Sequence, residues 1–357
     1  MRTTVSDQAF RACTPDGRRP APSELRDALD RMLSSALPRR RIVDLETRPM
    51  PYASSFALDE IRLRLDDGGT VDLVCKDTGQ AAMLAVAQRI KPRFLYNPIR
   101  EIATYESILA PLGIDAPRFY GKTIDKRRGR YWLFLERVSG QPLTEIGDFD
   151  VWRNASRWLA RMHSGVASET AMAHAATTVP LVRYDRAHWR RWMARAERYV
   201  RGGPEPLSRR TRFALLASQY EAVIEETAAL PAGFVHGELF ASNVLVQHAG
   251  AGVRVCPLDW ELAGIGPVLI DLAALTAGRW SDAEQAELAT SYHAALDPDS
   301  EIWLPREAFV RALDCCRLQI AVRHLGWATR WTPPSPHTQD WLGHALHAAE
   351  RIGLSLA

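Results

Sequence analysis

Lysine is nearly missing from this 357-residue chain. Only Lys76, Lys91, Lys122 and Lys126 occur, and the other 41 of its 45 basic residues are arginines. Because 42 acidic residues are interspersed with them, the net charge is only +3, which argues against a nucleic-acid-binding face. Where arginine is the default surface cation, a lysine inside a predicted strand is a functional candidate. Lys76 is such a lysine.

Long apolar runs and paired cysteines are also missing. The longest apolar stretch, residues 266–275, is interrupted by Asp271 and is too short to span a bilayer, so no membrane partner is expected. The first ten residues lack the apolar core of a secretion signal. The five cysteines include no CxxC pair, which predicts a reduced, cytoplasmic protein without structural zinc.

The hydrophobic pattern changes along the chain from strand-like to helical. Apolar residues at 61, 63 and 65 alternate with arginines, and a turn at 66–69 leads into a second strand that ends at Lys76. Asn97-Pro98 introduces a helix, and residues 131–135 form a continuous apolar run typical of a buried strand. Further on, the pattern predicts helices at 152–163, 188–200, 210–229, 282–296 and 306–328, and short strands at 244–246 and 253–255.

This order predicts an α+β fold with two lobes. Residues 1–40 would form a loose arm and a short helix, residues 41–137 a small β-rich lobe, and residues 138–357 a larger helical lobe. The length accommodates both lobes, because domains commonly contain about 100–200 residues. A small-molecule site is expected in the cleft of such an architecture.

The densest group of polar residues lies between positions 236 and 261. His236-Gly237-Glu238 and Asn243 precede the first short strand, and Asp259 follows the second. A hairpin at this place would let the oxygen atoms of Glu238, Asn243 and Asp259 converge. Carboxylate and amide oxygens suit Mg²⁺ held together with phosphate oxygens. The absence of cysteine or paired histidine nearby argues against zinc.

These motifs resemble the aminoglycoside phosphotransferase family and related small-molecule kinases, such as choline and homoserine kinases, which share a bilobal protein-kinase-like fold. The resemblance covers about residues 45–345 and follows the chain in order through Lys76, Glu101, 132–135, 157–163, 236–243, 258–261 and 266–272. It implies an enzyme that moves the γ-phosphoryl group of ATP or GTP, with Mg²⁺, to a hydroxyl of a small metabolite or antibiotic.

The resemblance also implies roles in the earlier lobe. Lys76 would contact the α- and β-phosphates and pair with Glu101. Glu106 is a rival partner, but it lies five residues on, about 140° around a helix. The other implied nucleotide contacts are Val74 over the adenine ring, backbone groups of Glu136 to Val138 at its edge, and Ser54 and Ser55 in the phosphate-covering loop.

In the later lobe, the resemblance makes Asn243 and Asp259 the Mg²⁺ ligands. Glu238 would orient the acceptor hydroxyl and take its proton. His236 would position the loop, and Asp271 would accept hydrogen bonds from its amides.

Glu238 departs from the family pattern, which has Asp at this position. One extra methylene moves the carboxylate by about 1 Å, a shift that costs about 10²-fold where alignment is the mechanism. Either the pocket is rebuilt around the longer side chain, or the protein binds nucleotide without turnover and is a silent or regulatory relative. Because Lys76, Asn243 and Asp259 are all present, we favour activity.

The expected acceptor helices have a mixed to basic composition with several tryptophans. This favours a neutral or anionic acceptor over a polycationic one. The residues concerned are Asp185, Arg186, His188, Trp189, Arg190, Arg191, Trp192, Arg195, Arg198, Arg201, Arg317, Arg323, Trp327 and Trp331.

Overall fold

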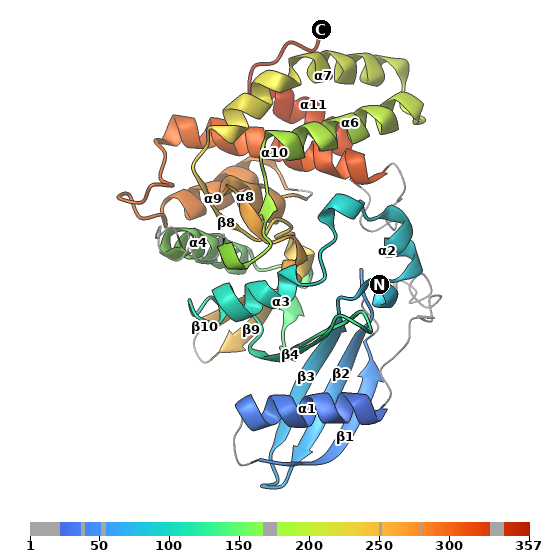
Figure 1. Cartoon of the computed structure of the whole chain (residues 1–357). Coiled ribbons are helices and arrows are strands. Elements are labelled where there is room, and N and C mark those ends of the chain that lie inside the picture. Colours follow the sequence, from blue (N-terminus) through green and yellow to red (C-terminus); the bar gives the residue numbers. More distant parts are fainter. Residues whose placement is uncertain are drawn as a thin grey trace, which may run out of the picture. The chain divides into compact units, whose positions relative to one another are not determined.

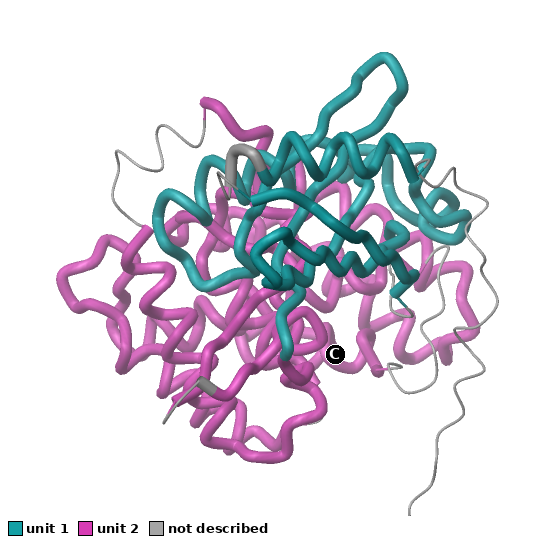
Figure 2. The backbone as a smooth tube through the Cα atoms, turned by 90° about the horizontal axis from the view of Figure 1, so that it is seen from below, with its two compact units in different colours: residues 1–139 teal, residues 140–357 magenta. Residues whose placement is uncertain are grey.

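The computed structural model describes residues 22–36, 40–50, 55–166, 177–249, 252–278, 280–328 and 339–357. The chain divides into two compact units, residues 1–139 and 140–357, coloured separately in Figure 2. The loose arm is expected over residues 1–22, and residues 1–21 lie outside the described part of the chain.

The first unit is built on a five-stranded antiparallel sheet with the order β1-β2-β3-β5-β4. Its strands are β1 (Ile42–Pro49), β2 (Leu58–Leu65), β3 (Thr70–Asp77), β4 (Phe119–Asp125) and β5 (Arg130–Glu136). The predicted hairpin is confirmed as β2 and β3, with Arg64 paired with Thr70 beside the turn. The alternation in β2 has its cause in burial, since Ile61, Leu63 and Leu65 are buried and the arginines between them are exposed.

Helix α1 (Pro22–Ala36) covers one face of this sheet (Figure 1). Its apolar stripe, Leu25, Leu29, Met32 and Leu33, is buried in one core with Ile61, Leu63, Leu73, Cys75, Trp132 and Phe134 of the strands. Because side chains alternate along a strand, burial of Leu73 and Cys75 under α1 directs Val74 and Lys76 to the opposite face.

Short helices follow the hairpin in the first unit. They are α2 (Ala85–Ile90) and α3 (Arg100–Thr104), and a single π-helical turn at Tyr105–Leu109 continues α3. The helix predicted after Asn97-Pro98 is present, but it begins at Arg100 rather than at the proline. The Asn97 side chain accepts a hydrogen bond from the Ile99 amide, which places Pro98 in a turn before the helix.

The second unit is mainly helical. Its helices are α4 (Phe149–Val166), α6 (Arg186–Gly202), α7 (Leu207–Ala228), α8 (Leu269–Leu275), α9 (Asp282–His293), α10 (Arg306–Ala328) and α11 (Trp341–Arg351). The helices predicted at 152–163, 188–200, 210–229, 282–296 and 306–328 are confirmed as α4, α6, α7, α9 and α10. Helix α10 is buried on nearly all sides, because α6, α8 and α11 pack against it (Figure 1).

Two small sheets complete the second unit. One has the order β10-β9-β6, and the other has the order β7-β11-β8. The strands are β6 (Gln141–Pro142), β7 (Val182–Arg183), β8 (Ala232–Val235), β9 (Val244–Ala249), β10 (Gly252–Pro257) and β11 (Gly264–Pro267). The predicted short strand pair is confirmed as β9 and β10, with Val244 opposite Pro257.

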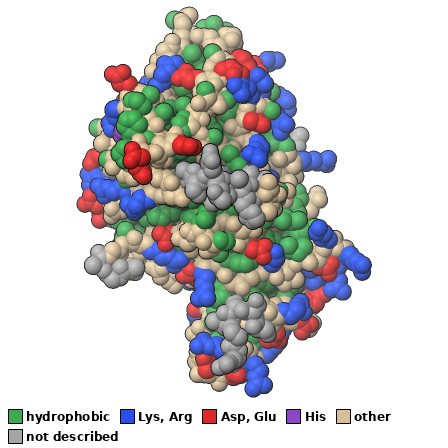
Figure 3. Space-filling view, turned by 60° about the vertical axis from the view of Figure 1, so that its left-hand side comes forward, with side chains coloured by type: hydrophobic (Ala, Val, Ile, Leu, Met, Phe, Trp, Pro, Cys, Tyr) green, Lys and Arg blue, Asp and Glu red, His purple; other side chains and the backbone are tan. Residues whose placement is uncertain are grey.

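The surface mixes the two signs of charge. Basic and acidic side chains alternate over the face shown in Figure 3. Among the described residues, no helix combines the length and the apolar character needed to cross a membrane. These features match the interspersed charges and short apolar runs of the sequence.

Candidate active site

In the first unit, Lys76 and Glu101 form a buried ion pair. Lys76 lies near the end of β3 and Glu101 lies in the first turn of α3. The Lys76 Nζ and Glu101 Oε2 atoms are 2.7 Å apart, and the two residues are 7% and 2% exposed. The predicted pair is therefore present. Glu106 is ruled out as the partner, because its carboxylate pairs with the exposed Lys122.

A contribution to stability is not enough to explain why this ion pair is buried. Removing two charges from water offsets much of their mutual attraction, so an ion pair of this kind is often no more stable than two apolar side chains. A buried pair with specific geometry is instead a frequent feature of functional sites. Lys76 is also one of only four lysines in the chain.

A second lysine lies near Lys76. The Nζ atoms of Lys76 and Lys91 lie 5.7 Å and 5.3 Å from the centroid of the Phe56 ring, and the Lys91 Nζ donates a hydrogen bond to the Ser55 hydroxyl. Ser55 is thus bonded to one cation, and its place in a phosphate-covering loop stays a prediction. Ser54 lies outside the described residues. Sequence reasoning missed Lys91, although the scarcity of lysine was a usable signal.

Backbone bonds restrict what the segment after β5 can offer a ligand. The Glu136 amide donates to the Arg118 carbonyl and the Arg137 amide donates to the Asp72 carbonyl. The Glu136 carboxylate accepts from the Arg118 amide. Among the amides of the segment Glu136 to Val138, whose backbone groups are predicted to contact adenine, that of Val138 is the one for which the described residues supply no backbone acceptor.

In the second unit, Asp271 anchors the loop that follows β8. Its two carboxylate oxygens accept hydrogen bonds from the amides of His236 (2.6 Å) and Gly237 (2.8 Å). The predicted amide hydrogen bonds of Asp271 are therefore present. Asp271 is fully buried near the start of α8, and His163 of α4 lies 3.4 Å from the same carboxylate.

The His236 imidazole is held as a neutral ring. The Glu238 amide donates to Nδ1 (3.2 Å), so Nδ1 carries a lone pair and Nε2 carries the proton that is donated to the Leu258 carbonyl (2.8 Å). Burial lowers the pKa of His236 against the opposing effects of Asp271 and the Leu258 bond. A fully buried neutral imidazole that joins the loop to the residue before Asp259 fits the predicted positioning role.

Gly237 is required by its backbone and by its surroundings. Its φ is +84°, and a Cβ at this position would overlap the Tyr184 hydroxyl and lie 2.5 Å from the Leu262 carbonyl oxygen. The Tyr184 hydroxyl donates to that same carbonyl (2.8 Å). Tyr184 was missed by sequence reasoning, since it follows a two-residue strand with no recognisable motif.

Asn243 and Asp259 lie at the same end of the β9–β10 hairpin. The Leu258 amide donates to the Asn243 carbonyl (2.7 Å), and Asp259 is the next residue. The Asn243 Nδ2 donates to the Glu238 carbonyl (2.9 Å), which directs the Oδ1 oxygen to the other side of the amide. One amide oxygen and one carboxylate, both half-buried, fit a Mg²⁺ ion that takes its remaining ligands from phosphate and water.

Among the described residues, no three His, Cys, Asp or Glu side chains form a group that could hold a metal ion. Asp259 has φ 62° and ψ 60° and is the only described non-glycine residue with a positive φ. Such strain is concentrated at functional positions.

The structure places several of the candidate acceptor residues in different surroundings. Trp189 and Trp192 are fully buried and belong to the core. Arg186 and Arg190 are exposed and pair with Glu225 and Glu221 of α7. Arg323 is buried beside the loop, and its Nη1 donates to the Gly237 carbonyl (2.5 Å). Trp331 lies outside the described residues.

A family model described as "Phosphotransferase enzyme family" matches residues 61–309 of the chain. The chain belongs to this family. It is a phosphotransferase, as the sequence resemblance predicted. No curated protein sequence matches it significantly.

Solved structures show the same bilobal fold as this phosphotransferase. A microcompartment-associated aminopropanol kinase superposes with a TM-score of 0.60 at 17% identity, over 92% of this chain and 99% of that one. A mutant aminoglycoside 2'-phosphotransferase-IIIa bound to GDP gives 0.55 at 14% identity, over 92% and 97%. Ethanolamine kinase from Plasmodium vivax gives 0.53 at 13% identity, over 86% and 82%.

Proposed function

We propose that this phosphotransferase transfers the γ-phosphoryl group of ATP or GTP to a hydroxyl of a small molecule. The observation that carries the proposal is the buried Lys76–Glu101 ion pair. In a chain of this family, with four lysines in all, a desolvated lysine held by a carboxylate is well suited to a nucleotide phosphate. The relative that was solved with GDP is consistent with a nucleotide donor.

Each residue has a part in this reaction, which depends on alignment and charge neutralisation more than on covalent help. Glu101 would orient Lys76 toward the α- and β-phosphates, and Val74 would cover the base on the same face of β3. Asn243 and Asp259 would hold Mg²⁺, which neutralises phosphate charge when bound. The Val138 amide is the proposed donor to the adenine edge.

Glu238 would orient the acceptor hydroxyl and take its proton. The loop around it is fixed by bonds to Asp271, Leu258 and Asn243. This order fixes the backbone from which the Glu238 carboxylate extends, and because Lys76, Asn243 and Asp259 are all present, we favour an active enzyme.

The test is nucleotide consumption with Mg²⁺ by the wild type and by single variants, with and without hydroxyl compounds. Asp259→Ala is expected to lower the rate by about 10²-fold or more, because a charge-stabilising group is lost. Lys76→Met should act similarly when the rate is expressed per folded molecule, with the folded fraction taken from a melting curve. Lys122→Met is the matched control, since that lysine is exposed and paired with Glu106, and its rate should stay unchanged.

Two results would contradict the proposal in different ways. Nucleotide that raises the melting temperature without being consumed under any condition would indicate a silent nucleotide-binding relative. Equal rates for the wild type and Glu238→Ala with a true acceptor would remove Glu238 from the mechanism while leaving the enzyme class intact.

A further inference from the structure

Arg323 of α10 is a buried cation attached to the candidate catalytic loop. It is 1% exposed, and its Nη1 donates to the carbonyl of the peptide bond that joins Gly237 to Glu238. Its Nε and Nη2 atoms are buried and make no hydrogen bond to any residue that the structure describes. Since a buried charge with few partners is costly, its retention indicates a purpose beyond packing.

The charge of this guanidinium acts on three histidines, one on α6, one on α10 and one in the loop. It lies close enough to His188, His236 and His324 to disfavour their protonated forms, in addition to the larger effect of burial, and the pKa of each is lowered. The acids that act on His236 of the loop from other elements are Asp271 and Asp259, and Glu238 adds a carboxylate within the loop itself. Asp271 is engaged by two amides, and Asp259 is the proposed Mg²⁺ ligand.

The aromatic residues next to the loop contact Arg323 and His324. The Arg323 guanidinium lies 5.8 Å from the centroid of the Phe240 ring. The edge of that ring meets His324 at 5.0 Å, and His324 stacks on Trp341 at 3.8 Å with an interplanar angle of 5°. One face of Phe240 and one face of Trp341 are thus already covered by nitrogen-bearing groups of this chain.

We propose that Arg323 is a positioning residue for Glu238 and that its charge makes the enzyme select neutral or anionic hydroxyl acceptors over cationic amines. This inference rests on the proposed function and names its substrate class. The guanidinium fixes the peptide plane before Glu238 from the carbonyl side, while Asp271 fixes Gly237 from the amide side. The guanidinium reaches the peptide bond before the acceptor-orienting carboxylate, so its charge would offset part of the attraction of that carboxylate for an ammonium group and disfavour a cationic acceptor by about tenfold.

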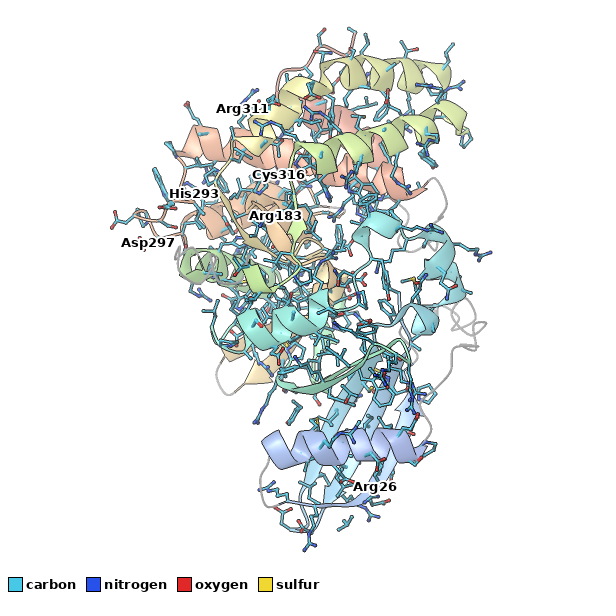
Figure 4. The ribbon with its side chains drawn as sticks, viewed as in Figure 1. Arg26, Arg183, His293, Asp297, Arg311 and Cys316 are labelled. Carbon is cyan, nitrogen blue, oxygen red and sulfur yellow. The ribbon has the colours of Figure 1, made fainter. Side chains whose placement is uncertain are left out.

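The experiment uses three sugars of similar shape and different charge: D-glucose, D-glucuronate and D-glucosamine. Each is measured as an acceptor and as an inhibitor of basal nucleotide hydrolysis, so that a bound but unreactive sugar still gives a constant. The variants are Arg323→Gln, which removes the charge, and Arg323→Lys, which keeps it. Arg311→Gln is the control, since Arg311 (labelled in Figure 4) lies on α10 and pairs with Glu226.

The wild type is expected to favour glucose or glucuronate over glucosamine by at least about tenfold, and Arg323→Gln should reduce that preference by a similar factor without changing KM for the nucleotide. Arg323→Lys should keep the preference but lower kcat, because the lysine lacks the planar fork that holds the loop. Melting curves identify any variant that fails to fold. If Arg323→Gln does not fold, the sugar preferences of the wild type and of Arg323→Lys test the inference.

A wild type that favours glucosamine, or a preference unchanged in folded Arg323→Gln, would overturn the inference while leaving the proposed phosphotransfer intact. An enzyme that binds nucleotide and never consumes it would overturn the proposed function, and the inference with it.

Discussion

The two units hold their candidate site residues by different means. In the first unit, Lys76 and Glu101 come from a strand and a helix and are joined to each other by opposite charge. In the second unit, the loop from His236 to Asn243 is fixed largely through backbone atoms, by Asp271, Arg323 and its own amides. A charge pair can be replaced as a unit, whereas backbone bonds cannot be restored by a second substitution.

Breaking the charge pair from one side gives the largest expected effect. Lys76→Met leaves the Glu101 carboxylate buried without its counter-charge and should lower the free energy of unfolding by about 3–5 kcal/mol. Lys76→Met combined with Glu101→Leu should recover most of that loss. Urea denaturation of both variants measures the difference. A double variant as unstable as the single one would show that the pair is not an independent unit.

The loop should respond to one methyl group. Gly237→Ala adds a Cβ against Tyr184 and Leu262 at a positive φ, and we expect a loss of about 2–4 kcal/mol from overpacking and backbone strain. Gly113→Ala is the matched control in the first unit. There φ is +63° and the added Cβ meets nothing within 4 Å, so only about 1 kcal/mol of strain is expected. Equal losses in the free energy of unfolding of the two variants would mean that contact with Tyr184 contributes nothing to the effect.

Asp271→Asn tests the backbone anchor itself. The amide keeps the shape of the carboxylate but replaces one acceptor by a donor, which would face a loop amide. We expect a loss of about 2–3 kcal/mol, since a charge-assisted bond is lost and a buried donor is unpaired. The measurement is thermal unfolding followed by tryptophan fluorescence. A wild-type melting temperature would contradict the anchoring role.

Acid should weaken the second unit through its histidines, since residues 1–139 contain none. Burial, reinforced by Arg323 and Arg191, lowers the pKa of His188 to about 3. Below pH 6.5 the unfolded chain therefore binds a proton that the folded chain does not, and stability falls as the pH is lowered. This residue alone should remove about 2 kcal/mol between pH 6.5 and 5. His188→Gln should flatten that slope in denaturation measured across this range, and an unchanged slope would argue against it.

Much of the fold was predictable because its elements carry strong local patterns. The β2–β3 hairpin has strict alternation and a turn of Asp and Gly, and long helices such as α4 have clear periods. β4 was missed because it is half-buried along most of its length and shows no alternation. The two-residue strands β6 and β7 are created by tertiary pairing and have no signal of their own.

The candidate site also contains residues that a sequence motif indicates and residues that it does not. Lys76, Glu101, Asn243 and Asp259 stand in motifs with fixed spacing, so the sequence could propose them as candidates. The structure confirms the Lys76–Glu101 ion pair, and the roles of Asn243 and Asp259 stay predictions. Arg323 was named only as one basic residue among many. Because α10 is buried on nearly all sides, it has no amphipathic stripe from which the burial of a single arginine could be inferred.

At Asp259, the residue that would be best for stability differs from the residue that the proposed chemistry needs. A left-handed conformation costs a residue with a Cβ about 1–2 kcal/mol, and glycine avoids that penalty. Selection for heat resistance alone, with turnover left out of the screen, should therefore favour glycine at position 259 and yield more stable molecules that lack the proposed metal ligand.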